Sequence, residues 1–186
     1  MKGTVIRNTG SAYTVRTDGG EEVSCRIKGN FRIKGIRTTN PVAVGDRVVF
    51  DEPGPDGVAL ITAIEPRRNY IIRRASNLSK AASIIAANVD AALLVVTLAH
   101  PSTSTTFIDR FLATARAYGV PAILAINKTD LLDDAESREL LDAVAYLYRS
   151  IGYQVAEVSA KTGLGLDGLR QLLAGKTTLF SGNSGV

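Results

Sequence analysis

The stretch AILAINKTDLL at residues 122–132 decides the fold of the second half of this chain. It begins with five apolar residues, a pattern typical of a strand that is buried on both faces. Polar residues follow from Asn127 to Asp130, so the strand delivers them to the carboxyl edge of a sheet. Open α/β folds place their ligands at this edge, and the stretch therefore predicts a ligand-binding loop.

The residues Asn127, Lys128, Thr129 and Asp130 have the spacing N-K-x-D, by which GTPases recognise guanine. The Asp130 carboxylate can accept hydrogen bonds from guanine N1–H and from the N2 amine, a donor pair that adenine lacks. Asn127 would tie neighbouring loops together, and the Lys128 stem would cover the base. The alternative is structural, with Asp130 as a helix cap and Asn127 in a turn.

A second motif follows one strand and one helix later, in EVSAKTGLGLDGL at residues 157–169. Ser159, Ala160 and Lys161 form S-A-K, the partner motif of N-K-x-D, and they precede an expected helix. A backbone N–H around Ala160 would reach guanine O6, and Lys161 would pack on the base. Two motifs in register favour a guanine site, because the structural alternative now needs two coincidences.

A phosphate-binding loop, G-x-x-x-x-G-K-[ST], is expected to begin near the end of the sequence. Its first residues are Gly182, Asn183, Ser184, Gly185 and Val186, and its backbone N–H groups would cradle phosphates. Counted from Gly182, the next residues should be Gly, Lys and Ser or Thr, so we expect a fragment of a longer protein. A flexible Gly/Ser tail is the alternative.

Apolar runs alternate with helical patterns over residues 88–186, which predicts a parallel sheet covered by helices. Expected helix starts are a capping pair of Thr106 with Asp109 and one of Asp133 with Glu136. Residues 1–73 contain short strands rich in Val, Ile, Tyr and Phe, separated by turns. These strands predict an OB-like barrel, with an SH3-like barrel as the alternative, and residues 74–87 are expected to be a linker.

The charged residues are also distributed differently between the two halves of the chain. Residues 1–80 hold 14 Lys and Arg against 8 Asp and Glu, whereas residues 81–186 hold 8 against 10. Basic side chains gather around aromatic ones in two groups, a pattern that suits RNA; a solvated charged loop is the alternative. The groups consist of Arg26, Lys28, Phe31, Arg32, Lys34 and Arg37, and of Arg67, Arg68, Arg73 and Arg74 around Tyr70.

Several classes of protein are excluded by composition. The lone Cys25 and the lone His100 cannot assemble a Cys/His zinc site within this sequence. The longest apolar stretch, residues 91–98, is far shorter than the roughly 20 residues that cross a bilayer. Because the N-terminus also lacks the apolar core of a signal peptide, we expect a cytoplasmic protein without membrane contact.

The order of the motifs, with N-K-T-D and S-A-K before the phosphate loop, is that of the circularly permuted GTPases. With an OB-like barrel in front, the chain resembles the RsgA family, also called YjeQ or YloQ, of bacterial GTPases that act in maturation of the small ribosomal subunit. The resemblance covers the whole chain. It includes VAVGDRVVF at residues 42–50, ANVDAALLVV at 87–96 and FSGNSGV at 180–186.

The resemblance implies an OB-like barrel joined to part of a circularly permuted P-loop GTPase domain of the α/β class. It implies that the full-length protein is a monomer that hydrolyses GTP to GDP and phosphate, uses Mg²⁺, carries one Zn²⁺ and binds the small (30S) subunit and its 16S rRNA. The loop lysine, the Mg²⁺ ligand, both switch regions and the zinc-binding domain are expected beyond Val186. We therefore expect no catalytic residue and no hydrolysis from residues 1–186 alone. The alternative is a non-enzymatic RNA-binding module whose α/β half senses guanine nucleotide or only supports the barrel.

Overall fold

A computed structural model describes residues 1–27, 41–74 and 82–186 of the chain. The chain divides into two compact units, Met1–Asn88 and Val89–Val186. This division falls next to residue 88, where the sequence pattern places the start of the α/β part. In the described ranges, no helix is both long enough and apolar enough to span a membrane.

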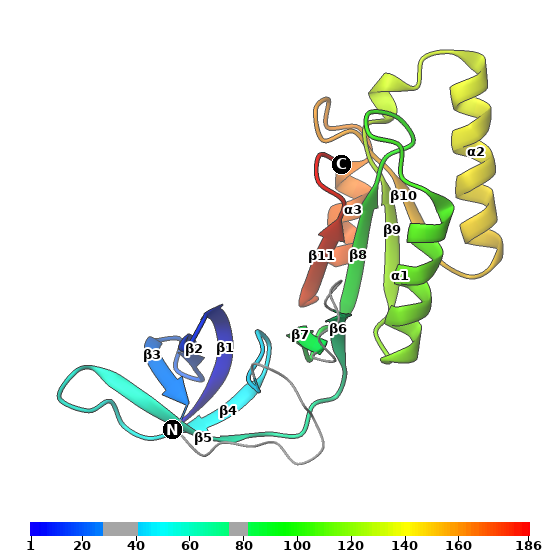
Figure 1. Cartoon of the computed structure of the whole chain (residues 1–186). Coiled ribbons are helices and arrows are strands. Elements are labelled where there is room, and N and C mark those ends of the chain that lie inside the picture. The colour runs from blue at the N-terminus through cyan, green and yellow to red at the C-terminus, as the bar shows by residue number, and fades with distance from the viewer. Residues whose placement is uncertain (28–40, 75–81) are drawn as a thin grey trace. The chain divides into compact units, whose positions relative to one another are not determined.

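The described part of the first unit contains a closed five-stranded barrel (Figure 1). Neighbouring strands are antiparallel, except that β3 runs parallel to β5. Because β3 pairs with β5 and not with the next strand along the chain, the path is a Greek key, which confirms the OB-like prediction. In barrel order, the strands are β1 (Lys2–Thr9), β2 (Ala12–Thr17), β3 (Glu22–Ile27), β5 (Val58–Ile64) and β4 (Arg47–Phe50).

Buried and more exposed residues alternate along the strands, and the buried side chains fill the barrel. In β1 and β2, for example, Val5, Tyr13 and Val15 are buried while their sequence neighbours are more exposed. A Cβ at Gly3 would lie 2.4 Å from the Arg16 carbonyl oxygen, so only glycine allows β1 to approach β2 this closely. The buried cluster consists of Val5, Tyr13, Val15, Cys25, Val42, Val48, Phe50, Ala59 and Ile61.

Beyond the barrel, the first unit contains a two-stranded antiparallel hairpin of β6 (Tyr70–Arg74) and β7 (Ala82–Ala87). The sequence pattern assigned residues 74–87 to a linker, and β7 corrects this assignment. The hairpin is anchored by its backbone, because the Ala87 N–H donates to the Val44 carbonyl oxygen at 2.9 Å. Small residues such as Ser and Ala obscure the strand in the sequence, since they carry little β propensity.

The second unit is built on a parallel sheet in the order β10-β9-β8-β11, as the sequence pattern predicts. Helices connect successive strands, so the unit follows βαβ topology. In chain order, its elements are β8 (Ala91–Val96), α1 (Thr105–Ala117), β9 (Ala122–Ile126), the 3-10 helix η1 (Thr129–Leu131), α2 (Ala135–Ser150), β10 (Gln154–Glu157), α3 (Leu166–Leu173) and β11 (Thr178–Gly182).

Helices cover both faces of this sheet, with α1 and α2 on one side and α3 on the other (Figure 1). Alternate residues of a strand therefore enter different cores: Leu94 packs with α1 and α2, whereas Leu93 packs on the α3 side. This burial on both faces explains why β8 and β9 are apolar without alternation. The loops at the strand ends are therefore attached to a sheet that is buried on both faces.

The two longer helices begin with side-chain caps close to the expected positions. Ser104 Oγ accepts a hydrogen bond from the Phe107 N–H at 3.3 Å, and Asp134 Oδ1 accepts one from the Ser137 N–H at 2.8 Å. The sequence placed these starts at Thr106 and Asp133, which is two residues late for α1 and one residue early for α2. Neighbouring Ser, Thr and Asp residues are all good N-caps, so composition alone does not choose among them.

Candidate nucleotide-binding site

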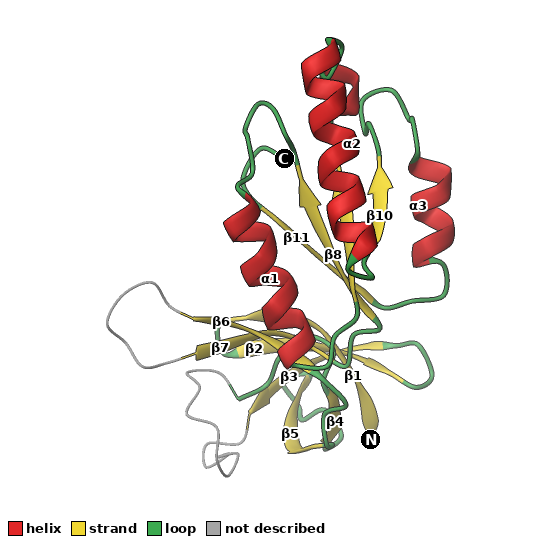
Figure 2. Cartoon of the chain, turned by 90° about the vertical axis from the view of Figure 1, so that its right-hand side faces the viewer, coloured by secondary structure: helices red, strands yellow, loops and turns green. Residues whose placement is uncertain are grey.

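The three predicted nucleotide-binding motifs lie at one edge of the second unit's sheet. Asn127 follows β9, Ser159 lies two residues after β10, and the phosphate loop begins at the end of β11. Because all four strands are parallel, their carboxyl ends meet at the same edge, toward which the arrowheads of β8 and β10 point in Figure 2. The sheet thus brings the motifs together as the sequence predicts.

The N-K-T-D loop is fixed by backbone hydrogen bonds to both neighbouring strands. The Asn127 N–H donates to the Val96 carbonyl oxygen at 2.8 Å. The backbone N–H and the hydroxyl of Thr129 both donate to the Val158 carbonyl oxygen, at 3.2 and 3.1 Å. Lys128 adopts a positive φ of 62°, which turns the chain into η1. The loop is therefore held in shape without a ligand.

Two side-chain hydrogen bonds join the N-K-T-D loop to the S-A-K loop. Asn127 Oδ1 accepts from the Ala160 N–H at 3.0 Å, and Asp130 Oδ1 accepts from the Ser159 hydroxyl at 2.6 Å. Ser159 is completely buried, and its oxygen also accepts from the Thr162 N–H. This contact orients the Asp130 carboxylate, a positioning role for Ser159 that the motif spacing does not reveal.

The polar atoms that stay open at this edge suit a guanine base. Within the described residues, Asp130 Oδ2 accepts no hydrogen bond, so this oxygen is available to a donor on a ligand. The Ala160 N–H, a candidate donor to guanine O6, is used by Asn127, but the N–H of Lys161 has no acceptor in the described part of the chain. The expected donor around Ala160 is therefore the N–H of Lys161.

Lys128 connects the guanine motif to two other loops. Its Nζ donates to the His100 carbonyl oxygen at 2.6 Å, in the loop after β8, and to the Gly185 carbonyl oxygen at 2.5 Å, in the loop after β11. The side chain therefore lies across the edge of the sheet with its ammonium group between these loops. That its aliphatic stem covers a base stays a prediction.

The loop from Gly182 to Val186 has the features that a phosphate site needs. A Cβ at Gly182 would lie 2.6 Å from the Val95 carbonyl oxygen, and Gly185 has a φ of +83°, so both positions require glycine. In the described residues, the N–H groups of Asn183, Ser184 and Gly185 have no acceptor. Successive free N–H groups form an anion-binding concavity.

The basic residues of the first unit have different roles. Arg26 is exposed on β3, and the exposed Arg68 is anchored by hydrogen bonds with Asn88. Arg67 is not a free cation: its Nε and Nη2 each donate to the buried Asp46 carboxylate at 2.7 Å. The Arg67 charge is thus balanced inside the protein, which removes the basis for predicting a contact between Arg67 and RNA.

The remaining predicted RNA contacts are not described by the structure. Lys28, Phe31, Arg32, Lys34 and Arg37 lie outside the described residues, as do the side chains of Arg73 and Arg74.

Neither metal that the resemblance implies has a ligand set here. In the described ranges, no group of three or more His, Cys, Asp or Glu residues lies close enough together to hold a metal ion. The described residues therefore do not fit a zinc site of this kind, and we assign neither Zn²⁺ nor Mg²⁺ to them.

A Greek-key barrel followed by a parallel sheet, with the guanine motifs ahead of the phosphate loop, defines the class of circularly permuted GTPases. A family model described as RsgA N-terminal domain matches residues 2–58, and one described as RsgA GTPase matches residues 64–186. The chain belongs to the RsgA family.

Individual relatives agree with this assignment. The chain is 57% identical over 188 residues to the small ribosomal subunit biogenesis GTPase RsgA of Bacteroides fragilis, and 58% identical over 187 residues to that of Porphyromonas gingivalis. All of the chain is covered, and it spans about 59% of the length of these relatives.

Two solved structures share the fold. The crystal structure of YjeQ from Thermotoga maritima matches with a TM-score of 0.74 and 32% identity, over 99% of this chain and 60% of that one. The structure described as YloQ, a circularly permuted GTPase, matches with a TM-score of 0.70 and 33% identity, with the same coverage of both chains.

Proposed function

We propose that the whole protein to which this chain belongs binds GTP and hydrolyses it to GDP and phosphate during late maturation of the small ribosomal subunit. The observation that carries the proposal is the hydrogen-bonded pair of guanine motifs beside a loop with free N–H groups. The relatives from Bacteroides fragilis and Porphyromonas gingivalis, named small ribosomal subunit biogenesis GTPases, support it.

Base recognition would depend on atoms that the fold holds in place before the ligand arrives. The Asp130 carboxylate, oriented by Ser159, accepts hydrogen bonds from guanine N1–H and the N2 amine. The N–H of Lys161 donates to O6, and the stem of Lys128 covers the face of the base. Adenine offers an acceptor at N1 and an amine at C6, so it mismatches this arrangement.

Phosphate binding would begin at the loop after β11. The N–H groups of Asn183, Ser184 and Gly185 donate to phosphate oxygens, as in other glycine-rich loops. The transfer step needs cations at the β- and γ-phosphates, so we assign hydrolysis to the whole protein and not to residues 1–186. When bound there, Mg²⁺ would supply part of this positive charge.

The partner that we propose for the barrel is the 16S rRNA of the small subunit. The first 80 residues carry the chain's excess of basic side chains, and RNA phosphates attract such a surface. Of the two predicted basic groups, Arg26 and Arg68 are exposed in the described residues, and Lys28, Phe31, Arg32, Lys34 and Arg37 are predicted members outside them. We further propose that the protein acts as a monomer in the cytoplasm, without membrane contact.

The test measures phosphate release by the full-length protein with GTP, ATP or XTP, with and without small ribosomal subunits. We expect hydrolysis of GTP only, accelerated by the subunits. Asp130→Asn should move the preference from GTP to XTP, because xanthine carries an oxygen in place of the N2 amine. Asp133→Asn, the same change at an exposed position nearby, is the matched control.

Two results would contradict the proposal. Equal turnover of GTP and ATP, or GTP turnover that Asp130→Asn leaves unchanged, would remove the guanine assignment. Binding of rRNA without any nucleotide hydrolysis would instead support the non-enzymatic RNA-binding module.

A further inference from the structure

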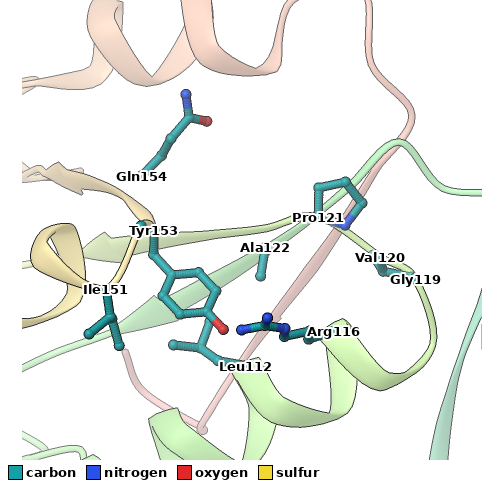
Figure 3. A pocket seen from close by; sticks show the side chains of 10 residues that line it. Leu112, Arg116, Gly119, Val120, Pro121, Ala122, Ile151, Tyr153 and Gln154 are labelled. Carbon is teal, nitrogen blue, oxygen red and sulfur yellow. The ribbon is translucent and has the colours of Figure 1, made fainter.

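A pocket lies beside the amino-terminal ends of β9 and β10, at the opposite edge of the sheet from the guanine motifs. Figure 3 shows its lining from close by. Its volume is about 490 Å³. It is lined by Leu112 and Arg116 of α1, by residues 119–122 at the start of β9 and by residues 151–154 at the start of β10. Because β9 and β10 run from this pocket toward the guanine motifs, a ligand here would not touch a bound nucleotide.

Most of the pocket wall is apolar. Pro121, Ala122 and Ile151 contribute exposed hydrocarbon surface, and residue Ile151 is 59% exposed although it is large and apolar. None of the described residues that line the pocket has an acidic side chain. A ligand with an apolar body would therefore remove hydrocarbon surface from water on both sides of the contact.

One end of the pocket is polar and positively charged. Figure 3 shows the Arg116 guanidinium directed toward the Tyr153 hydroxyl. Arg116 has no hydrogen-bonded or ionic partner for its side chain within the described residues. By contrast, the nearby Arg149 is paired with Glu157 at 2.7 Å. The pocket thus holds a cation whose N–H donors are all available.

The pocket lies beside the carboxyl-terminal ends of α1 and α2, and Arg116 belongs to the last turn of α1. Carbonyl groups at helix ends carry partial negative charge, but several of them here already accept hydrogen bonds. The Ala115 carbonyl oxygen accepts from the Tyr118 and Val120 N–H groups, and the Arg149 carbonyl oxygen accepts from the Gly152 N–H. The carbonyl oxygens of Ala115 and Arg149 are therefore already paired.

We propose that this pocket binds a small organic acid with an apolar body and one carboxylate. The Arg116 guanidinium can donate two parallel hydrogen bonds to the carboxylate, and the Tyr153 hydroxyl can donate a third. The apolar body lies against Pro121 and Ile151. The volume falls in the range of about 300 to 1,000 Å³ that is usual for small-molecule sites.

The test titrates the ¹⁵N-labelled chain with 3-phenylpropanoate and with the matched alcohol 3-phenylpropan-1-ol, and follows backbone amide shifts by NMR. We expect saturable shifts from the acid at Gly119, Ala122 and Gly152. Arg116→Gln should weaken acid binding about tenfold and leave binding of the alcohol unchanged. Tyr153→Phe should give a smaller loss, because it removes one donor only.

Arg110→Gln is the control, because Arg110 is exposed on the same helix but does not line the pocket. Equal affinity for acid and alcohol, equal effects of Arg116→Gln and Arg110→Gln, or an absence of shifts at the pocket would each overturn the proposal. The dispersion of each spectrum shows whether a variant is folded. None of these outcomes depends on whether the protein binds GTP.

Discussion

Two loops of this molecule, one in each unit, hold an aspartate in opposite ways. In the loop before β4, Asp46 is completely buried, and both carboxylate oxygens accept hydrogen bonds from Arg67, with a further bond from the Ala43 N–H. In the loop after β9, Asp130 is only partly buried and is held by Ser159 through one oxygen. The first carboxylate is fully paired, whereas the second keeps an acceptor open.

This difference in pairing distinguishes a carboxylate that stabilises the fold from one that can recognise a ligand. A buried carboxylate must be fully paired, because an unpaired charge in the interior is costly. A carboxylate that recognises a ligand must instead be oriented and left incomplete, so that the ligand supplies the missing donors. The contacts of Asp46 are those of a structural residue, whereas the open oxygen of Asp130 supports the binding role proposed for it, although both lie in loops next to strands.

The largest effect is expected at Asp46. Asp46→Asn removes the charge that Arg67 faces and should lower the free energy of unfolding by about 3–5 kcal/mol. Urea unfolding of the chain, followed by near-UV circular dichroism of its tyrosines, measures this change. Asp18→Asn breaks an exposed pair with Arg47 and should have little effect. Equal losses in the two variants would contradict the comparison.

Asp130→Asn should show the reverse behaviour. We expect urea unfolding close to that of the unchanged chain, because the side chain is partly exposed and keeps an acceptor for Ser159. The affinity of the full-length protein for GDP should fall about 100-fold, as two charge-assisted hydrogen bonds are lost. Calorimetric titration measures the affinity. A large loss of stability with unchanged affinity would show that Asp130 is a structural residue.

Ser159→Ala tests whether orientation of Asp130 matters. Without the hydroxyl, Asp130 loses its anchor and the Thr162 N–H loses its acceptor. We expect GDP affinity to fall about tenfold and stability to fall by about 1 kcal/mol. Ser150→Ala, which removes an exposed hydroxyl that donates to the Leu147 carbonyl oxygen, is the control. An affinity equal in both variants would mean that Asp130 needs no positioning.

The smallest effect is expected at the exposed Asp134, the N-cap of α2. The hydrogen bond from the Ser137 backbone N–H holds the Asp134 pKa below its usual value. A lowered pKa stabilises the folded state above the unfolded pKa of about 3.9, and this contribution is lost as pH falls through the folded value. Asp134→Ala should therefore lower the thermal midpoint slightly at pH 7. The difference from the unchanged chain should shrink below about pH 4, and a difference that persists there would contradict this role.

Short-range patterns in the sequence were sufficient to predict the barrel, the parallel sheet and the assembly of the guanine motifs. A loop begins where its strand ends, so a correctly predicted strand such as Ala122–Ile126 also fixes the position of the next residue, Asn127. The misplaced helix starts at Thr106 and Asp133 have the opposite cause, since several adjacent residues can cap a helix. Local patterns thus predict elements well and their ends less well.

Long-range pairing explains what the sequence did not predict. Arg67 was predicted to contact RNA because it belongs to a basic cluster, yet its partner, Asp46, lies 21 residues away. The hydrogen bond between Ser159 and Asp130 joins residues 29 apart. Neither pair has a local signal, because both depend on how loops from different strands meet. The pocket beside Arg116 has no local signal either, because residues between 112 and 122 and residues 151–154 line it together.

The two hydrogen bonds of Lys128 have a further consequence. One ammonium group binds both the His100 and the Gly185 carbonyl oxygens, so the conformation of the loop before α1 and that of the loop after β11 are linked equilibria. A ligand that moves Gly185 away from Lys128 also changes the free energy of the His100 loop. Such linkage is reciprocal. A ligand that shifts the His100 loop would change the affinity of the proposed phosphate site by the same factor by which phosphate changes the affinity for that ligand.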